Sequence, residues 1–71
     1  MKEIEAWVTR DRNGKPYLYR VKPIKFSNMW LAEHEYTEGI NFMRLADDSF
    51  PEVQWTDEEP TKVKITIERC K

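Results

Sequence analysis

The feature that most constrains this chain is an Asn13-Gly14 pair between two stretches of alternating residues. Asn and Gly both tolerate a positive φ, which short hairpin turns require. Before the pair, the apolar residues 4, 6 and 8 alternate with Glu5, Trp7 and Thr9, and the alternation resumes over residues 17–22. A period of two is typical of a half-buried strand. The pattern therefore predicts an antiparallel hairpin with strands at 3–9 and 16–22.

A last strand is predicted at residues 62–69. Its β-branched residues Val63, Ile65 and Ile67 point to one side and its polar residues to the other, as in a sheet with one wet face. We expect this strand to join the same sheet as the first hairpin. Its Lys62 and Lys64 would then lie across from Glu3 and Glu5.

The middle of the chain allows two interpretations. Ser27 is a suitable N-cap for a helix near 28–37 that ends before Gly39. Three glutamates would then crowd the negative end of the helix dipole, which is unfavourable. The favoured alternative has short strands near 29–32 and 40–45. Residues 47–52 are expected to form a turn or a single turn of 3₁₀ type.

Length and composition favour one folded domain spanning residues 1–71. Aromatic residues make up 13% of the 71 residues, and the net charge is only −1, which together argue against disorder. The longest apolar run is four residues (29–32), too short for a transmembrane helix or the apolar core of a signal peptide. A single cysteine excludes an internal disulfide framework. We expect a cytoplasmic protein.

The predicted fold class is mainly β, as a single small antiparallel sheet or a partly closed barrel with a short helical turn. The alternative is an α+β fold with one helix near 28–37. Trp30 and Phe42 should close over the core of the sheet. The other expected core residues are Ile4, Ala6, Val8, Val21, Ile65 and Ile67.

Several stretches resemble a group of short phage and prophage-type proteins from gut anaerobic bacteria. The most specific of them is the Phe-Pro-Glu-Val run at 50–53, followed by the Trp-Thr-Asp-Glu-Glu-Pro-Thr run at 55–61. Trp7, the turn at 11–14 and the segments at 17–19 and 22–24 add to the likeness, which covers nearly the whole chain. The resemblance implies a mobile-element origin and an extended conformation at 40–45. It supplies no catalytic residues.

The residue types needed for catalysis or for holding a cofactor are scarce. His34 and Cys70 are the only residues of their kinds, and Cys70 lies next to the chain end, where a preorganised nucleophile is hard to build. A structural zinc site needs four convergent ligands, mostly Cys or His. Two glycines exclude a glycine-rich phosphate loop. The sequence therefore predicts no enzyme activity, no catalytic residues, no metal site and no cofactor.

The charges divide along the chain. Residues 1–32 carry seven basic and three acidic groups, residues 33–60 carry one basic and nine acidic, and residues 61–71 carry four basic and one acidic. Basic residues interleaved with tyrosines can hold single-stranded nucleic acid, and the candidate contacts are Arg10, Arg12, Arg20 and Lys22. A pI of about 5.8 opposes this function, because nucleic-acid domains commonly exceed 9. It remains the alternative.

Aromatic residues support the main functional prediction, a small accessory protein that binds a protein partner or a second copy of itself. A core this thin cannot conceal every aromatic side chain, and an exposed aromatic patch favours association. The candidate partner-binding residues are Trp7, Tyr17, Tyr19 and Trp55. Trp55 is also expected to anchor an exposed acidic turn at 57–60.

Overall fold

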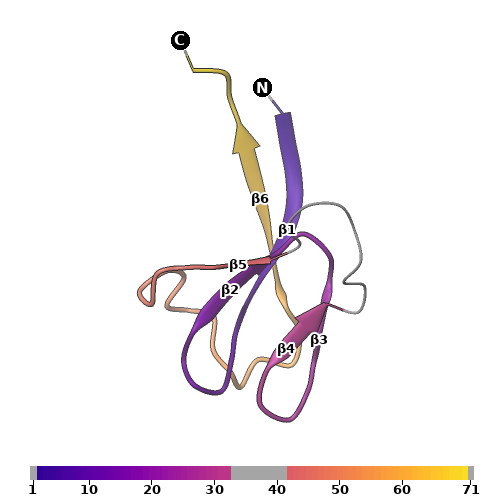
Figure 1. The fold of residues 1–71 in the computed structure, drawn as a ribbon, viewed down its shortest axis with the longest axis vertical. Coiled ribbons are helices and arrows are strands. Elements are labelled where there is room, and N and C mark those ends of the chain that lie inside the picture. Colours follow the sequence, from indigo (N-terminus) through magenta and orange to yellow (C-terminus); the bar gives the residue numbers. More distant parts are fainter. Residues whose placement is uncertain (1, 33–41, 71) are drawn as a thin grey trace.

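The computed structural model describes residues 2–32 and 42–70, and within them the fold is built from strands. In chain order the strands are β1 (Lys2–Arg10), β2 (Pro16–Tyr19), β3 (Pro23–Lys25), β4 (Trp30–Ala32), β5 (Phe42–Arg44) and β6 (Thr61–Ile67). They form a four-stranded antiparallel sheet with the order β5-β2-β1-β6 and a separate two-stranded sheet of β3 and β4 (Figure 1). The predicted β class is confirmed.

The first hairpin forms where the sequence predicts it. β1 and β2 pair with Trp7 opposite Tyr19 and Arg10 opposite Pro16. Gly14 has a φ of 88° in the turn, a conformation that suits glycine because it has no Cβ. β2 ends at Tyr19, earlier than the predicted end at residue 22, and the chain then turns before Pro23 opens the second hairpin.

The last strand also lies where it was expected. β6 pairs antiparallel with β1, with Ile4 opposite Ile65. The Lys62 ammonium lies 3.1 Å from the Glu5 carboxylate, and the Lys64 ammonium 3.7 Å from that of Glu3. These two ion pairs confirm the predicted pairing of lysines and glutamates across β1 and β6.

Two details of the fold prediction need correction. Of the two predicted architectures the structure has the antiparallel sheet and not the partly closed barrel, because β5 and β6 remain the two ends of the sheet and the β3–β4 hairpin forms its own sheet. Residues 47–52 form ordinary turns, as one of the two expectations for them has it, and not the helical turn of the other, and no helix occurs in the described residues. Of the alternative helix at 28–37, residues 30–32 are strand β4 and residues 33–37 lie outside the described part. No described segment could cross a membrane as a helix.

The core is smaller and more central than predicted. Ala6, Val8 and Trp30 are buried as expected, and Val53 from the loop after β5 joins them. Ile67 is 48% exposed, and Ile4, Val21 and Ile65 are only half-buried. The reason is that the outer parts of β1 and β6 extend beyond the other described strands (Figure 1), so no described segment forms a second layer over them. The Phe42 side chain lies outside the described part.

Candidate functional site

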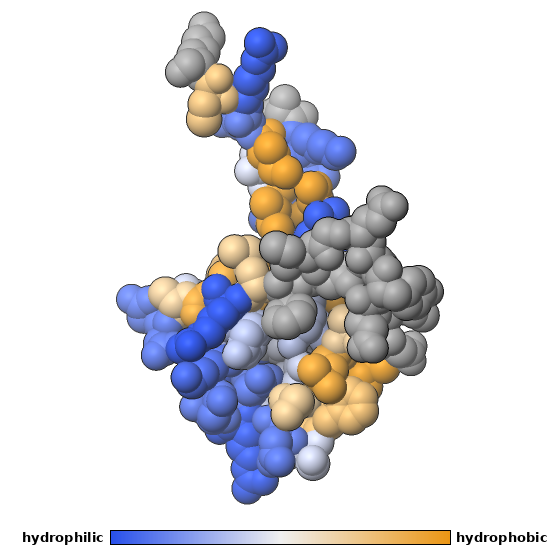
Figure 2. Space-filling model, in the orientation of Figure 1, coloured by the Kyte–Doolittle hydropathy of each residue, from blue (hydrophilic) through white to orange (hydrophobic). Residues whose placement is uncertain are grey.

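The β3–β4 hairpin presents four large apolar side chains to solvent on one face. Ile24 lies opposite Leu31 in the register. The next pair on the same face, towards the turn, is Phe26 and Met29, and the Phe26 N–H donates to the Met29 carbonyl at 2.7 Å. The exposed fractions are 43% for Ile24, 52% for Phe26, 42% for Met29 and 46% for Leu31. We call these four residues the hairpin face. Figure 2 shows apolar surface over this hairpin.

Alternation within the hairpin explains why this face is exposed. Lys25 and Trp30 are paired and lie between the four apolar residues, so their side chains point to the opposite side, towards the four-stranded sheet. Trp30 is 2% exposed. Burial of one large aromatic ring holds the hairpin against the sheet and leaves the four apolar neighbours facing outward.

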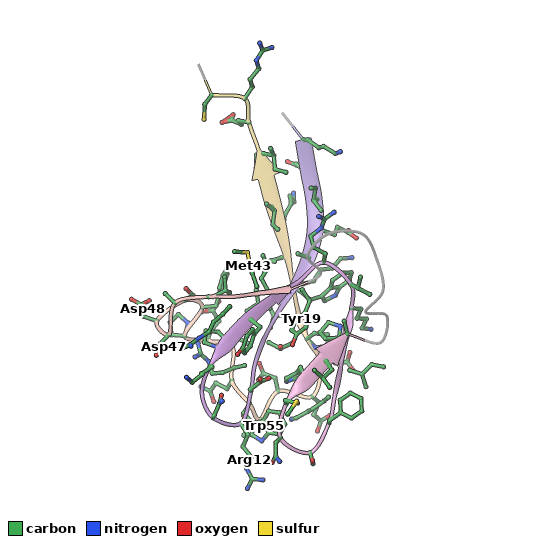
Figure 3. The ribbon with its side chains drawn as sticks, in the orientation of Figure 1. Arg12, Tyr19, Met43, Asp47, Asp48 and Trp55 are labelled. Carbon is green, nitrogen blue, oxygen red and sulfur yellow. The ribbon has the colours of Figure 1, made fainter. Side chains whose placement is uncertain are left out.

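Three polar contacts fix the Trp30 strand in place. The Tyr19 hydroxyl donates to the Trp30 carbonyl at 2.6 Å (Figure 3), and the Trp30 N–H donates to the Asp11 carboxylate at 3.0 Å. The Arg12 N–H donates to the Asn28 carbonyl at 3.1 Å, which joins the turns of the two hairpins. The hairpin face therefore rests on a support that is tied by hydrogen bonds to the first sheet.

The burial of these anchoring groups changes their acidity. Burial raises the pKa of the Asp11 carboxyl, and the hydrogen bond from the Trp30 N–H opposes that change. Burial also raises the pKa of Tyr19 to about 12, aided by the electrostatic effects of Asp11 and Tyr17 and opposed by the Thr9 hydroxyl. Tyr19 is therefore a protonated hydrogen-bond donor at neutral pH.

Lys25 fastens the same hairpin to the loop that precedes β6. Its ammonium group donates to the Trp55 carbonyl at 2.6 Å and to the Asp57 carbonyl at 3.0 Å. The ammonium also lies 4.3 Å from the centroid of the Trp55 ring and 5.8 Å from that of Trp30. Cation–π contacts of this kind stabilise a desolvated lysine.

A hollow of about 330 Å³ adjoins the tip of the hairpin face. It lies between the turns of the two hairpins and is lined by Asp11, Arg12, Asn13, Asn28 and Met29. Met29 therefore belongs both to the hairpin face and to the wall of the hollow. An apolar ridge beside a hollow whose lining surface is mostly apolar can accept a side chain from another protein.

The four predicted partner-binding aromatics do not form one exposed patch. Trp7, Tyr17 and Tyr19 share one side of the sheet, but Tyr19 is only 3% exposed and the other two are half-buried. Trp55 is half-buried and engaged with Lys25. Tyr19 is thus a structural residue and is not accessible to a partner, because the second hairpin covers its side of the sheet.

The predicted nucleic-acid residues are also divided. All five N–H groups of the Arg10 guanidinium bond to backbone carbonyls, namely those of Gly14, Asp47, Ser49, Phe50 and Val53. Arg10 is therefore unavailable to a phosphate. Arg12 and Arg20 are exposed, and Lys22 lies 3.9 Å from the Glu59 carboxylate.

Within residues 2–32 and 42–70, no group of three or more His, Cys, Asp or Glu side chains could hold a metal ion. The single histidine, His34, lies outside that part, and Cys70 is exposed near the chain end. The feature of the described surface that points to a function is the exposed apolar hairpin face.

The sequence interpretation did not identify the hairpin face, although a signal was present. Apolar residues occur at 24, 26, 29 and 31, and Lys25 and Trp30 lie between them. These positions are symmetric about the Ser27-Asn28 pair, as a hairpin with a two-residue turn requires. Recognising that symmetry would have placed all four side chains on one side.

Comparison with protein-family models, curated proteins and solved structures finds no match for this chain.

Proposed function

We propose that this protein is a protein-interaction module that binds its partner through the hairpin face. The observation that carries the proposal is that Ile24, Phe26, Met29 and Leu31 are each more than two-fifths exposed on one side of a single hairpin. Isolated exposed apolar residues are ordinary, but contiguous ones rimmed by polar residues mark interaction surfaces.

The support beneath this face favours binding over adventitious exposure. Tyr19, Asp11 and Lys25 hold the hairpin through its backbone and its inner side chains. A preorganised apolar surface loses little conformational entropy when a partner covers it. The neighbouring hollow adds a place for one side chain of the partner, with Met29 shared between the two.

Site-specific photocrosslinking in the cells that produce the protein tests this function. A benzophenone side chain replaces Phe26 in one variant and Phe50 in the matched control, since Phe50 is a second phenylalanine that is 39% exposed on a different loop. We expect discrete crosslinked species from position 26 and none of the same mass from position 50. Changing Ile24 and Leu31 to Ser should remove those species without unfolding the protein.

Two results would contradict the proposal. One is an absence of crosslinked species from position 26, and the other is the same pattern from both positions. A phage or mobile-element origin stays a prediction from the resemblance of the 50–61 region, and the mass and identity of the crosslinked partner would bear on it directly.

A further inference from the structure

The outer edge of β6 carries a row of backbone groups that the described strands leave unpaired. β6 is the terminal strand of the four-stranded sheet and runs for seven residues, and no described segment pairs with its outer side. Edge strands of this length readily pair with another chain unless something blocks them. β6 contains no proline and no interruption in its register with β1.

The register identifies the backbone groups that point outward. The Asp11 N–H donates to the Lys15 carbonyl, and the Pro16 carbonyl accepts a bond from Leu45 on its other side. Arg10 and Pro16 are therefore a non-hydrogen-bonded pair, and the ladder alternates from there. The even-numbered residues of β1 consequently bond to β6, through residues 61, 63, 65 and 67. The N–H and carbonyl groups of Lys62, Lys64 and Thr66 therefore face away from the sheet.

The lysines on this strand do not block its edge. Lysine side chains commonly guard edge strands by carrying a charge to the open side. Here the ammonium groups of Lys62 and Lys64 lie over β1, at 3.1 and 3.7 Å from the carboxylates of Glu5 and Glu3. The guarding charges are thus directed inward and are neutralised within the chain.

The apolar side chains around this edge are also left uncovered by the described segments. Residues 2–6 of β1 and 63–67 of β6 form a two-stranded arm that extends from the body (Figure 1). One side of the arm carries a stripe of Ile4, Val63, Ile65 and Ile67, which are half-buried or exposed, and Figure 2 shows apolar surface along it. A two-stranded ribbon is marginally stable in water, and additional strands stabilise it.

We propose that the β6 edge pairs antiparallel with the β6 edge of a second copy, centred on Ile65. In this register, Ile65 lies opposite Ile65 of the second copy, and Val63 lies opposite Ile67. On the other side of the sheet, Lys62 faces Glu68 of the second copy, and Glu68 is exposed near the end of the strand. The strand is thus complementary to itself in both apolar character and charge.

Shifts of the centre by one residue are less favourable. Centring on Lys64 would place two Lys64 ammonium groups opposite each other, and like charges in that position destabilise a sheet. Centring on Thr66 would place Val63 opposite Arg69 and shorten the apolar stripe. Only the register centred on Ile65 pairs every apolar residue of the strand with another apolar residue.

Sedimentation equilibrium of the full chain tests the pairing. All proteins carry Cys70→Ser, so that a disulfide between the exposed Cys70 thiols cannot imitate a dimer. Thr66→Pro removes an outward N–H and leaves every bond to β1, because proline is tolerated on a free edge. We expect it to raise the dimer Kd by about 30-fold or more, whereas the control Thr66→Ala leaves the Kd within about threefold. Circular dichroism checks that each variant remains folded.

A charge exchange tests the register. Glu68→Lys places two like-charged pairs across the dimer and should raise the Kd by about tenfold. Lys62→Glu combined with Glu68→Lys restores opposite charges and should recover the dimer. A parent chain that stays monomeric at about 1 mM, or a Thr66→Pro variant that dimerises like the parent, would overturn the proposal. A double variant that does not recover the dimer would overturn the register. The hairpin face takes no part in these measurements, so either proposal can fail alone.

Discussion

The Arg10 guanidinium donates a hydrogen bond of 2.7 Å to the carbonyl oxygen of Val53, a residue 43 positions away in the sequence. The remaining guanidinium N–H groups reach four more carbonyls, among them those of Ser49 and Phe50. Phe50 has a φ of 51°, which a bulky residue adopts only where its surroundings hold it there. One side chain thus fixes a loop that has no regular structure of its own.

Replacing Arg10 by Lys should therefore be strongly destabilising, although the charge is kept. A lysine supplies three donors from one atom and cannot reproduce the planar fork. We expect the free energy of unfolding to fall by about 2 kcal/mol, measured by urea denaturation. The control is Arg20→Lys at an exposed position, which should change it by less than about 0.5 kcal/mol. Equal effects at the two positions would show that the carbonyl contacts of Arg10 contribute nothing.

Tyr19 should make the protein sensitive to alkali. Its pKa is raised to about 12 in the folded chain, above the value of about 10 expected after unfolding. A raised pKa stabilises the fold fully below pH 10, and this contribution is lost as the pH rises from about 10 to 12. The Tm values of the parent and of Tyr19→Phe, measured by thermal melts, should therefore converge as the pH rises over that range. At pH 7 the phenylalanine variant should be less stable by about 1 kcal/mol, because the Trp30 carbonyl loses its donor.

Lys25 and Trp55 should be energetically coupled. Trp55→Ala is expected to lower the free energy of unfolding by about 2 kcal/mol, less than a wholly buried tryptophan would, because Trp55 is half-buried. Lys25→Met should cost a similar amount through the lost contacts with the Trp55 ring and carbonyl. A double-mutant cycle should give a coupling free energy of about 1 kcal/mol between Lys25 and Trp55. If the two effects simply add, the contact between these residues does not stabilise the fold.

The acidic turn beside Trp55 should contribute much less to stability than Trp55 does. Glu58 and Glu59 are exposed, and the carboxylate of Glu59 has a loose ion pair of 3.9 Å with Lys22. Such pairs contribute little to stability. Changing both glutamates to Gln should therefore shift the Tm by only about 1–2 °C, measured by calorimetry. A large loss of stability would instead assign the turn a structural role.

Asp11 should tolerate Asn better than Ala. The Asp11 carboxylate accepts the Trp30 N–H at 3.0 Å, which an Asn oxygen can also do, whereas Ala leaves that donor unpaired and should cost about 1–2 kcal/mol. Burial raises the pKa of Asp11, so its contribution to stability is largest when it is protonated and declines as the pH rises through the raised value. The free energy of unfolding of Asp11→Asn, taken relative to that of the parent, should therefore rise between pH 3 and pH 7. Urea denaturation at both pH values measures it.

The sequence by itself determined the local elements with strong periodicity. The Asn13-Gly14 turn set the β1–β2 pairing, and the alternation of residues 62–67 placed β6 beside β1 with the expected lysine–glutamate pairs. These features depend on side-chain alternation and turn chemistry, which act over a few neighbouring residues. Strands near 29–32 and 40–45 could be favoured over a helix for a different local reason, because three glutamates would crowd the negative end of the helix dipole.

Only the tertiary structure decided how the pieces cover one another. The carbonyls that bind Arg10 and Lys25 belong to loops without periodicity, and backbone acceptors carry no signature in the residue types. Tyr19 became a buried donor because the second hairpin lies over it, and the hairpin face became exposed because Trp30 filled the opposite side. Burial of this kind is set by contacts between segments far apart in the chain. A pattern within any one segment can place a side chain on a face, but the packing of the other segments determines whether that face is covered.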